Sequence, residues 1–116
     1  MIKQAKTPEE KRKCWDWIRG KGFTPMTDLF FYIDDIACAG ITVGFGDTSK
    51  VGFIEPLLSD SVSASVALYN FCEGYLKGLG VQYIICVSTN EKVWNMLEKL
   101  NYRLWTDMSK QYIKEL

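Results

Sequence analysis

Residues 51–90 read VGFIEPLLSDSVSASVALYNFCEGYLKGLGVQYIICVSTN, and four patterns follow one another within them. A β-prone apolar run (51–58) precedes a hydroxyl-rich turn (59–65), an amphipathic segment that ends at Gly80, and a second β-prone run (81–88). A strand, a long helix and another strand make a parallel crossover unit, which is almost always right-handed. We therefore predict two parallel strands joined by a helix, with a buried stripe of Val62, Val66, Tyr69, Cys72, Leu76 and Leu79.

Pro56 interrupts the first of these two strands. Because proline has no N–H to give to a strand ladder, it occurs within strands at edges or at bulges. A bulge would part this strand from its parallel neighbour and leave unpaired backbone groups facing a cleft. The sequence therefore predicts a cleft between the two parallel strands, next to the start of the linking helix.

The flanking segments supply further strands and helices. The clearest local signal is Thr7-Pro8-Glu9-Glu10, a helix N-cap with proline at the first position and a glutamate that completes a capping box. That helix runs to about Arg19, and a shorter helix covers 91–100. The remaining strands are residues 2–5, 29–33, 36–43, 102–105 and 111–113, of which the second and third form an antiparallel meander with 51–58. The order β-α-β-β-β-α-β-α-β-β predicts an α+β fold, with one mixed sheet flanked by three helices in a single domain over residues 1–116.

The composition excludes several classes of function. The 116 residues carry 14 basic and 14 acidic side chains, so no basic surface indicates nucleic-acid binding. The chain has no histidine, which removes the usual general base and the commonest metal ligand, and we expect no metal site. We expect no membrane span and no signal peptide, because the apolar runs are short. Buried reduced thiols and a cytoplasmic setting are favoured by the absence of a C-x-x-C pair among Cys14, Cys38, Cys72 and Cys86.

Two short motifs stand out for their order and spacing. Residues 90–102 read NEKVWNMLEKLNY, an asparagine followed by a helical segment, and residues 53–56 read FIEP. The first resembles the late motif of the GNAT (N-acetyltransferase) superfamily, in which a helix ends in a Tyr-Glu-Lys-Leu-Gly-Phe-like run. The second is similar to the bulged fourth strand on which many members carry a glutamate base. The resemblance covers nearly the whole chain.

The resemblance implies acyl transfer from acetyl-CoA to an amine, carried by a small molecule or by a protein. It implies that Glu55 acts as the base, and that the backbone of Leu57 and Leu58 pairs with the pantetheine arm of the cofactor. The pyrophosphate would then lie at the start of the long helix, where free N–H groups and the helix dipole favour an anion. The further residues that would bind the cofactor are Ser61, Ser63, Ser65 and Asn90.

Two positions depart from the family's pattern. The phosphate loop falls on residues 60–65, DSVSAS, which contain no glycine and place Asp60 where the family has a positive or neutral side chain. A like charge at 4 Å costs about 1 to 4 kcal/mol, whereas a helix N-terminus contributes only about 0.3 to 1 kcal/mol. The family tyrosine that protonates the leaving thiolate corresponds to Leu97. Loss of a general acid lowers the rate about 10²- to 10⁴-fold, which an enzyme can survive.

These departures leave a second hypothesis open, in which the fold has lost acetyl-CoA binding and serves as a binding or structural protein. In what it lacks, the chain is similar to small GNAT-like proteins of tailed phages, which would place it in a virion. Its partner would be another protein or a second copy of itself. Glu55 would then be a surface carboxylate paired with a lysine. Ser59, Asp60 and Ser61 would only be candidates for the N-cap of the long helix, and Asn90 would only cap the next helix.

Overall fold

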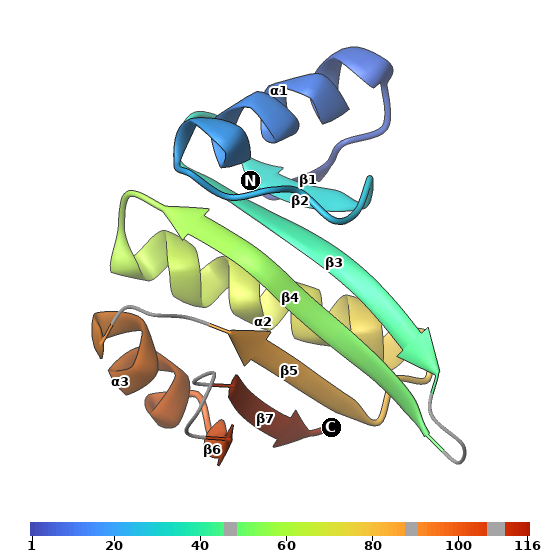
Figure 1. Ribbon diagram of the computed structural model, residues 1–116, viewed down its shortest axis with the longest axis vertical. Coiled ribbons are helices and arrows are strands. Elements are labelled where there is room, and N and C mark those ends of the chain that lie inside the picture. Colours follow the sequence, from blue (N-terminus) through green and yellow to red (C-terminus); the bar gives the residue numbers. More distant parts are fainter. Residues whose placement is uncertain (46–48, 88–90, 107–110) are drawn as a thin grey trace.

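The structure, a computed structural model, describes residues 1–45, 49–87, 91–106 and 111–116 (Figure 1). These residues form one seven-stranded sheet and three helices. The strands are β1 (Lys3–Gln4), β2 (Phe30–Ile33), β3 (Ala37–Phe45), β4 (Lys50–Ser59), β5 (Tyr83–Val87), β6 (Arg103–Thr106) and β7 (Gln111–Glu115), and the helices are α1 (Pro8–Gly20), α2 (Val62–Gly78) and α3 (Glu91–Lys99). The strand order β1-β2-β3-β4-β5-β7-β6 confirms the predicted α+β mixed sheet with three helices.

The crossover unit lies in the middle of the sheet. β4 and β5 are parallel, with Val51 opposite Tyr83, and α2 links them. β2, β3 and β4 form the predicted antiparallel meander, while β7 lies between β5 and β6 and is antiparallel to both. Because the carboxyl ends of parallel strands meet at one edge of a sheet, the starts of α2 and α3 lie at the same edge (Figure 1).

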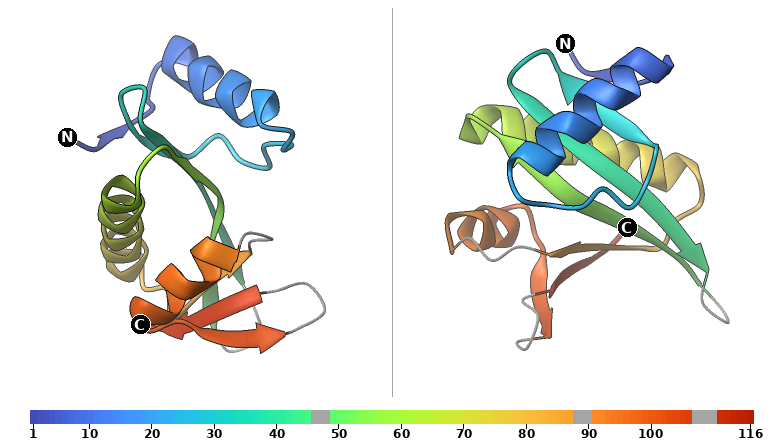
Figure 2. Two further views of the ribbon diagram at one scale, coloured as in Figure 1. Left: turned by 90° about the vertical axis from the view of Figure 1, so that its left-hand side faces the viewer. Right: turned by 45° about the horizontal axis from the view of Figure 1, so that its top comes forward.

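α1 and α2 cover opposite faces of the sheet (Figure 2). On one face α2 and α3 share a core that includes Phe31, Ile54 and Leu97. On the other face α1 packs on a smaller cluster that includes Ile18 and Phe30. The neighbours Phe30 and Phe31 belong to different clusters, since successive side chains of a strand point to opposite faces. The four cysteines are buried and none forms a disulfide, as predicted.

The capping box at the start of α1 is confirmed. The Glu10 N–H donates to Thr7 Oγ1 at 3.1 Å, and the Thr7 N–H donates to Glu10 Oε1 at 3.2 Å. At the end of α3, Asn101 adopts φ 71°, the left-handed conformation that ends many helices. No helix among the described residues has the length and apolar character needed to cross a membrane.

The predicted buried stripe of α2 is wrong at both ends. Val62 is 72% exposed and Leu79 is 41% exposed, whereas Ala64 and Leu68 are buried in the core. Leu79 lies beyond the last turn as the C-cap, and Val62 lies in the first turn. The rest of the stripe is confirmed at Tyr69, Cys72 and Leu76, which are buried, whereas Val66 is half-buried and lines a cavity.

β4 carries the predicted bulge. In the β3–β4 ladder the register shifts between Ala39 and Ile41, so Gly40 alone opposes Glu55 and Pro56. The peptide bond between Glu55 and Pro56 is cis. A bulge, in which two residues of one strand oppose a single residue of the other, bends the strand and disrupts its ladder. The bulge lies where β4 leaves β5, and it therefore sets the position of the site described below.

A methyl group at position 40 is expected to destabilise the fold by about 1 to 3 kcal/mol, because the bulge leaves no room for it. A Cβ there would lie 2.9 Å from the Glu55 carbonyl oxygen and 3.1 Å from Thr27 Cγ2. Gly74, within α2, has no atom within 4 Å of its Cβ position, so Gly74→Ala should stabilise by about 0.5 to 1 kcal/mol. Urea unfolding of Gly40→Ala and Gly74→Ala measures both effects. Equal stability of the two variants would contradict the close approach at the bulge.

Candidate functional site

The β4–β5 ladder ends before β4 does. Its last pair is Ile54 with Cys86, whereas β4 continues to Ser59. Leu57 and Leu58 pair with β3 and have no β5 partner among the described residues. Figure 1 shows β4 and β5 diverging toward the start of α2. The strand separation predicted from Pro56 is therefore confirmed, and one edge of β4 carries no neighbouring strand over its last residues.

A cavity of about 370 Å³ lies between the diverging strands, and we call it the inner cavity. Leu57 packs with the core under α2 and Leu58 with the cluster under α1, yet both line this cavity. The inner cavity is therefore bordered by side chains from both faces of the sheet. Its lining also includes Phe23, Glu55, Ser65, Tyr69, Val87 and Met96.

A second cavity of about 650 Å³ lies between the start of α2 and α3, and we call it the outer cavity. Its lining includes Asp60, Ser61, Val62, Lys92, Asn95 and Lys99. The inner and outer cavities share four lining residues, which are Ser59, Ser65, Val93 and Met96. The two cavities therefore adjoin, and we refer to them together as the groove, which extends from the first turn of α2 to the bulge of β4.

Serine side chains organise the start of α2. Ser61 is the N-cap, and its Oγ accepts from the Ala64 N–H at 3.1 Å. The Ser61 N–H donates to Ser59 Oγ at 3.1 Å, and Ser65 Oγ donates to the Ser61 carbonyl at 3.1 Å. Two N–H groups of the first turn, those of Val62 and the next residue, have no hydrogen-bond partner among the described residues. An anion in the outer cavity would meet these two donors and the positive end of the helix dipole.

Two lysines of α3 change the electrostatics of the outer cavity. Lys92 and Lys99 both line it, opposite Asp60. Their spacing of seven residues places them on the same face of the helix. Among the described residues that line the outer cavity, these two lysines and Asp60 carry the charges. The positive charge of the lysines therefore opposes the repulsion between the Asp60 carboxylate and an anion. Sequence reasoning missed these lysines, although their spacing was the signal that could have revealed them.

Glu55 lies on the bulge at the inner cavity, as the sequence predicted. Its side chain is exposed, and it forms no ion pair with a lysine among the described residues. The preceding Ile54 points into the core under α2, so alternation along the strand directs Glu55 toward the α1 side. Phe23, from the loop after α1, lines the same cavity. A carboxylate here can accept a proton from a group that enters from the α1 side.

The other predicted residues divide into two groups. Leu57, Leu58 and Ser65 line the inner cavity, and Ser61 lines the outer one. Ser63 is exposed and lines neither cavity, although its backbone N–H is one of the two unpartnered donors. Asn90 lies outside the described residues.

Leu97, which stands where the resemblance expects a tyrosine, is fully buried in the core. The side chain of Leu97 therefore cannot act as an acid.

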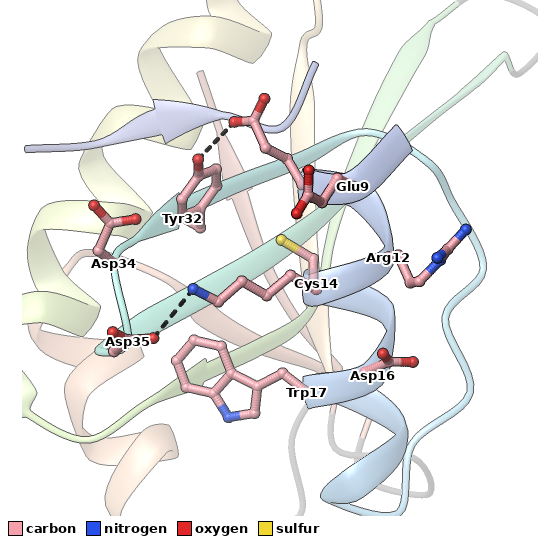
Figure 3. Close-up of a pocket in the computed structure, with 10 residues that line it drawn as sticks. Glu9, Arg12, Cys14, Asp16, Trp17, Tyr32, Asp34 and Asp35 are labelled. Carbon is pink, nitrogen blue, oxygen red and sulfur yellow. Dashed lines mark hydrogen bonds and ion pairs between the residues drawn. The ribbon is translucent and has the colours of Figure 1, made fainter. Parts of the chain in front are cut away.

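A third cavity, of about 510 Å³, lies between α1 and the β2–β3 hairpin (Figure 3). It shares no lining residue with the groove. Its lining is rich in charged side chains and also includes Cys14 and Trp17. No cluster of three or more side chains suited to hold a metal ion occurs among the described residues.

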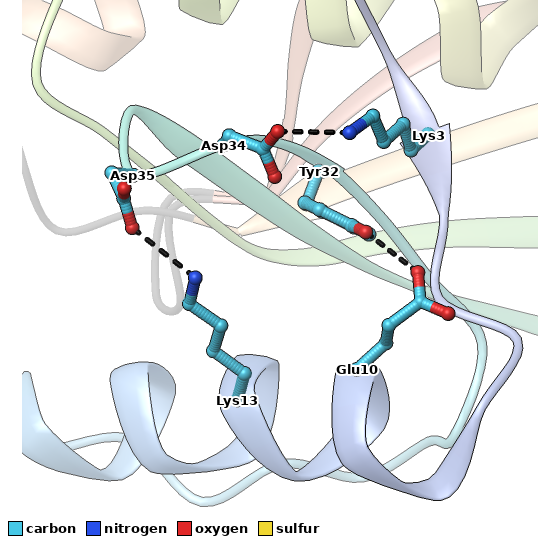
Figure 4. A network of polar contacts seen from close by, with 6 residues as sticks. All are labelled: Lys3, Glu10, Lys13, Tyr32, Asp34 and Asp35. Atoms are coloured by element: carbon cyan, nitrogen blue, oxygen red, sulfur yellow. Dashed lines mark hydrogen bonds and ion pairs between the residues drawn. The ribbon is translucent and has the colours of Figure 1, made fainter.

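The polar groups around this third cavity bind one another (Figure 4). The Tyr32 hydroxyl donates to Glu10 Oε2 at 2.6 Å, and this hydrogen bond raises the pKa of Tyr32 to about 12 and lowers the pKa of Glu10. Two ion pairs, Lys3 with Asp34 at 2.9 Å and Lys13 with Asp35 at 3.4 Å, connect β1 and α1 to the turn between β2 and β3. The hydrogen bond of Glu10 and the ion pair of Lys13 join α1 to the sheet, whereas the ion pair of Lys3 joins β1 to the turn.

Comparison with known proteins gives two different results for sequence and for structure. No protein-family profile and no curated protein sequence matches the chain. A GNAT-family acetyltransferase from Listeria monocytogenes matches it in structure with a TM-score of 0.68, at 15% identity, over 100% of this chain and 94% of the other. The chain has the GNAT acetyltransferase fold.

Two further structures with the GNAT fold were solved with bound CoA or acetyl-CoA. The NatC complex, bound to Gag peptide and CoA, matches with a TM-score of 0.80, at 10% identity, over 100% of this chain and 98% of the other. NAA60 from Arabidopsis thaliana, in complex with acetyl-CoA, matches with a TM-score of 0.63, at 9% identity, over 100% of both chains. At these sequence identities the structural similarity establishes the fold. Any activity has to be argued from the residues of the site.

Proposed function

We propose that the protein is an acetyl-CoA-dependent N-acetyltransferase that binds its cofactor in the groove. The observation that carries the proposal is that the inner and outer cavities adjoin and together extend from the start of α2 to Glu55. GNAT-fold structures such as the NatC complex and NAA60 contain CoA or acetyl-CoA. A groove with an anion-binding end and a carboxylate at its other end suits a long cofactor with phosphates at one end and a thioester at the other.

The roles of the groove residues follow from their positions. The unpaired edge of β4 at Leu57 and Leu58 offers backbone groups to the amides of the pantetheine arm. The pyrophosphate lies at the first turn of α2, near the backbone N–H of Ser63 and the hydroxyls of Ser61 and Ser65. Lys92 and Lys99 add positive charge on the opposite wall. Asn90 remains the proposed contact from the segment after β5.

The reaction joins the acceptor amine to the acetyl group. Glu55 takes a proton from the substrate ammonium, directly or through water, and the freed nitrogen attacks the thioester carbonyl carbon. A C–N bond forms, the C–S bond breaks and the nitrogen releases its second proton to water. CoA thus leaves as a thiolate, which takes up a proton from water. Since a thiol has a pKa of about 8.5, the thiolate leaves readily without an acid at position 97. Holding the two reactants together in the groove supplies the remaining acceleration.

Thermal unfolding with acetyl-CoA tests this proposal. At a cofactor concentration of about 100 times the dissociation constant, binding should add about 2.7 kcal/mol to the free energy of unfolding. An assay for thiol release with a panel of small amines and peptides then identifies the acceptor. No stabilisation at millimolar acetyl-CoA would contradict the proposal and leave the protein as a non-catalytic binding or structural relative of the acetyltransferases.

Reversing both lysine charges in the double variant Lys92→Glu/Lys99→Glu should weaken acetyl-CoA binding about 10- to 100-fold. The reason is that each lysine–phosphate attraction at about 4 Å contributes about 1 to 4 kcal/mol, depending on exposure. Calorimetric titration at low and high salt measures the change, and the effect should shrink at high salt. Lys6→Glu/Lys77→Glu is the matched control, because it changes the net charge equally at exposed positions that line neither cavity. Equal weakening by both double variants would show that only the net charge matters.

A further inference from the structure

The side chain of Tyr69 brings a polar group to the wall of the inner cavity. Tyr69 is only 3% exposed, yet it lines that cavity. Its hydroxyl has no hydrogen-bond partner among the described residues. Tyr102 offers a contrast, because its unpartnered hydroxyl is sealed within the core and lines none of the three cavities.

The Tyr69 hydroxyl reaches the surface of the inner cavity, since the hydroxyl of Tyr102, but not that of Tyr69, is buried without a partner. A polar group at a cavity wall can hydrogen-bond to water or to a bound molecule. The ring of Tyr69 packs 6.4 Å from that of Tyr102, and a phenylalanine would pack equally well there. The hydroxyl makes no hydrogen bond to a described residue and is therefore available to a molecule that enters the cavity.

The position of Tyr69 along α2 identifies the end of the groove that it serves. Ser65 lines both cavities, and Tyr69, one helical turn further from the start of α2, lines only the inner one. The same cavity is lined by Glu55 on the bulge. Tyr69 therefore lies at the end where the thioester and the base meet, remote from the phosphates.

We propose that the Tyr69 hydroxyl donates a hydrogen bond to the acyl carbonyl oxygen of the thioester, and this inference rests on the function proposed above. A carbonyl oxygen is a far better acceptor than a thioester sulfur. Tyr69 thus recognises the acyl group and distinguishes acetyl-CoA from free CoA. The hydrogen bond strengthens when negative charge develops on that oxygen during attack.

The buried environment of Tyr69 keeps its hydroxyl protonated, so that it can donate a hydrogen bond. Burial raises the pKa of Tyr69 well above its ordinary value, so the phenol stays protonated throughout the physiological range. Proton transfer from this phenol to a thiolate of pKa about 8.5 would be uphill. Tyr69 therefore differs in role from an acid that protonates the leaving group, and no proton leaves it during the reaction.

Calorimetric titration of the full chain with acetyl-CoA and with CoA tests the inference. Tyr69→Phe should weaken acetyl-CoA binding about three- to tenfold and leave CoA binding unchanged, because one neutral hydrogen bond is lost. Tyr102→Phe is the matched control and should change neither affinity. Thermal unfolding without ligand should show that Tyr69→Phe is about as stable as the parent protein, since the hydroxyl makes no hydrogen bond to a described residue.

Each other outcome overturns the inference in a recognisable way. Unchanged acetyl-CoA affinity in Tyr69→Phe would show that the hydroxyl makes no contact with the acyl group. Equal weakening of acetyl-CoA and CoA would show that the hydroxyl contacts the thiol portion or only shapes the cavity. If the parent protein binds neither ligand, the proposed function itself fails, and this inference fails with it.

Discussion

Replacing Glu55 with glutamine is expected to lower kcat/KM for acetyl transfer about 100- to 10,000-fold, with acetyl-CoA affinity unchanged. The amide has nearly the same shape as the carboxylate but cannot take a proton from the acceptor ammonium. Glu55 is exposed on the bulge and forms no ion pair among the described residues, so its loss should leave the fold intact. Initial rates of thiol release, measured with the amine that supports the fastest turnover, determine the change.

Glu98→Gln is the matched control for this variant. Glu98 is exposed on α3 and lines neither cavity of the groove, so its replacement should leave kcat/KM within about twofold of the parent value. A Glu55→Gln enzyme with nearly full activity would show that another base, or water alone, deprotonates the acceptor. Loss of acetyl-CoA binding in the same variant would mean that Glu55 supports the cavity and has no role in proton transfer.

The second large effect concerns stability. Lys114→Met should destabilise the protein by about 3 to 5 kcal/mol, because it leaves a mostly buried carboxylate without its partner. Lys114 Nζ lies 3.0 Å from Glu73 Oε2, and the two side chains are only 22% and 14% exposed. The same ammonium donates to the Leu100 carbonyl at 2.9 Å and lies 5.4 Å from the ring centroid of Tyr102. One cation thus connects α2, the end of α3 and β7.

Urea unfolding measures this loss, and a thermal midpoint lowered by about 10 to 20 °C should accompany it. The double variant Glu73→Met/Lys114→Met removes both charges and should regain most of the lost stability, since apolar side chains of similar volume can replace a buried ion pair. A loss below about 1 kcal/mol in Lys114→Met would show that the pair behaves as a solvated surface contact.

Local signals in the sequence were sufficient to predict the order of the elements. The Thr7 capping box, the left-handed Asn101 and the proline within β4 each require one specific backbone geometry, and the structure contains all three. The buried face of α2 was harder to predict. Its residues are apolar on several sides, so the periodicity could not reveal that Ala64 and Leu68 face the sheet while Val62 lies at the groove.

The groove depends on contacts that no single segment encodes. Residues 60–65 alone indicated a poor phosphate site, because Asp60 is the only charged residue among them. Lys92 and Lys99 come from the other helix at this edge of the sheet, and only the parallel pairing of β4 and β5 brings the two helix starts together. Likewise, the sequence pattern predicts only that Tyr69 is a core residue. Its place at the inner cavity depends on the divergence of β4 and β5.

The inner cavity borders both faces of the sheet, with Leu57 on one side and Leu58 on the other. For the proposed reaction this geometry suits two reactants that approach from opposite faces. The cofactor would lie along α2 and the amine would approach past Phe23. The acetyl group would then be transferred between them where β4 and β5 diverge.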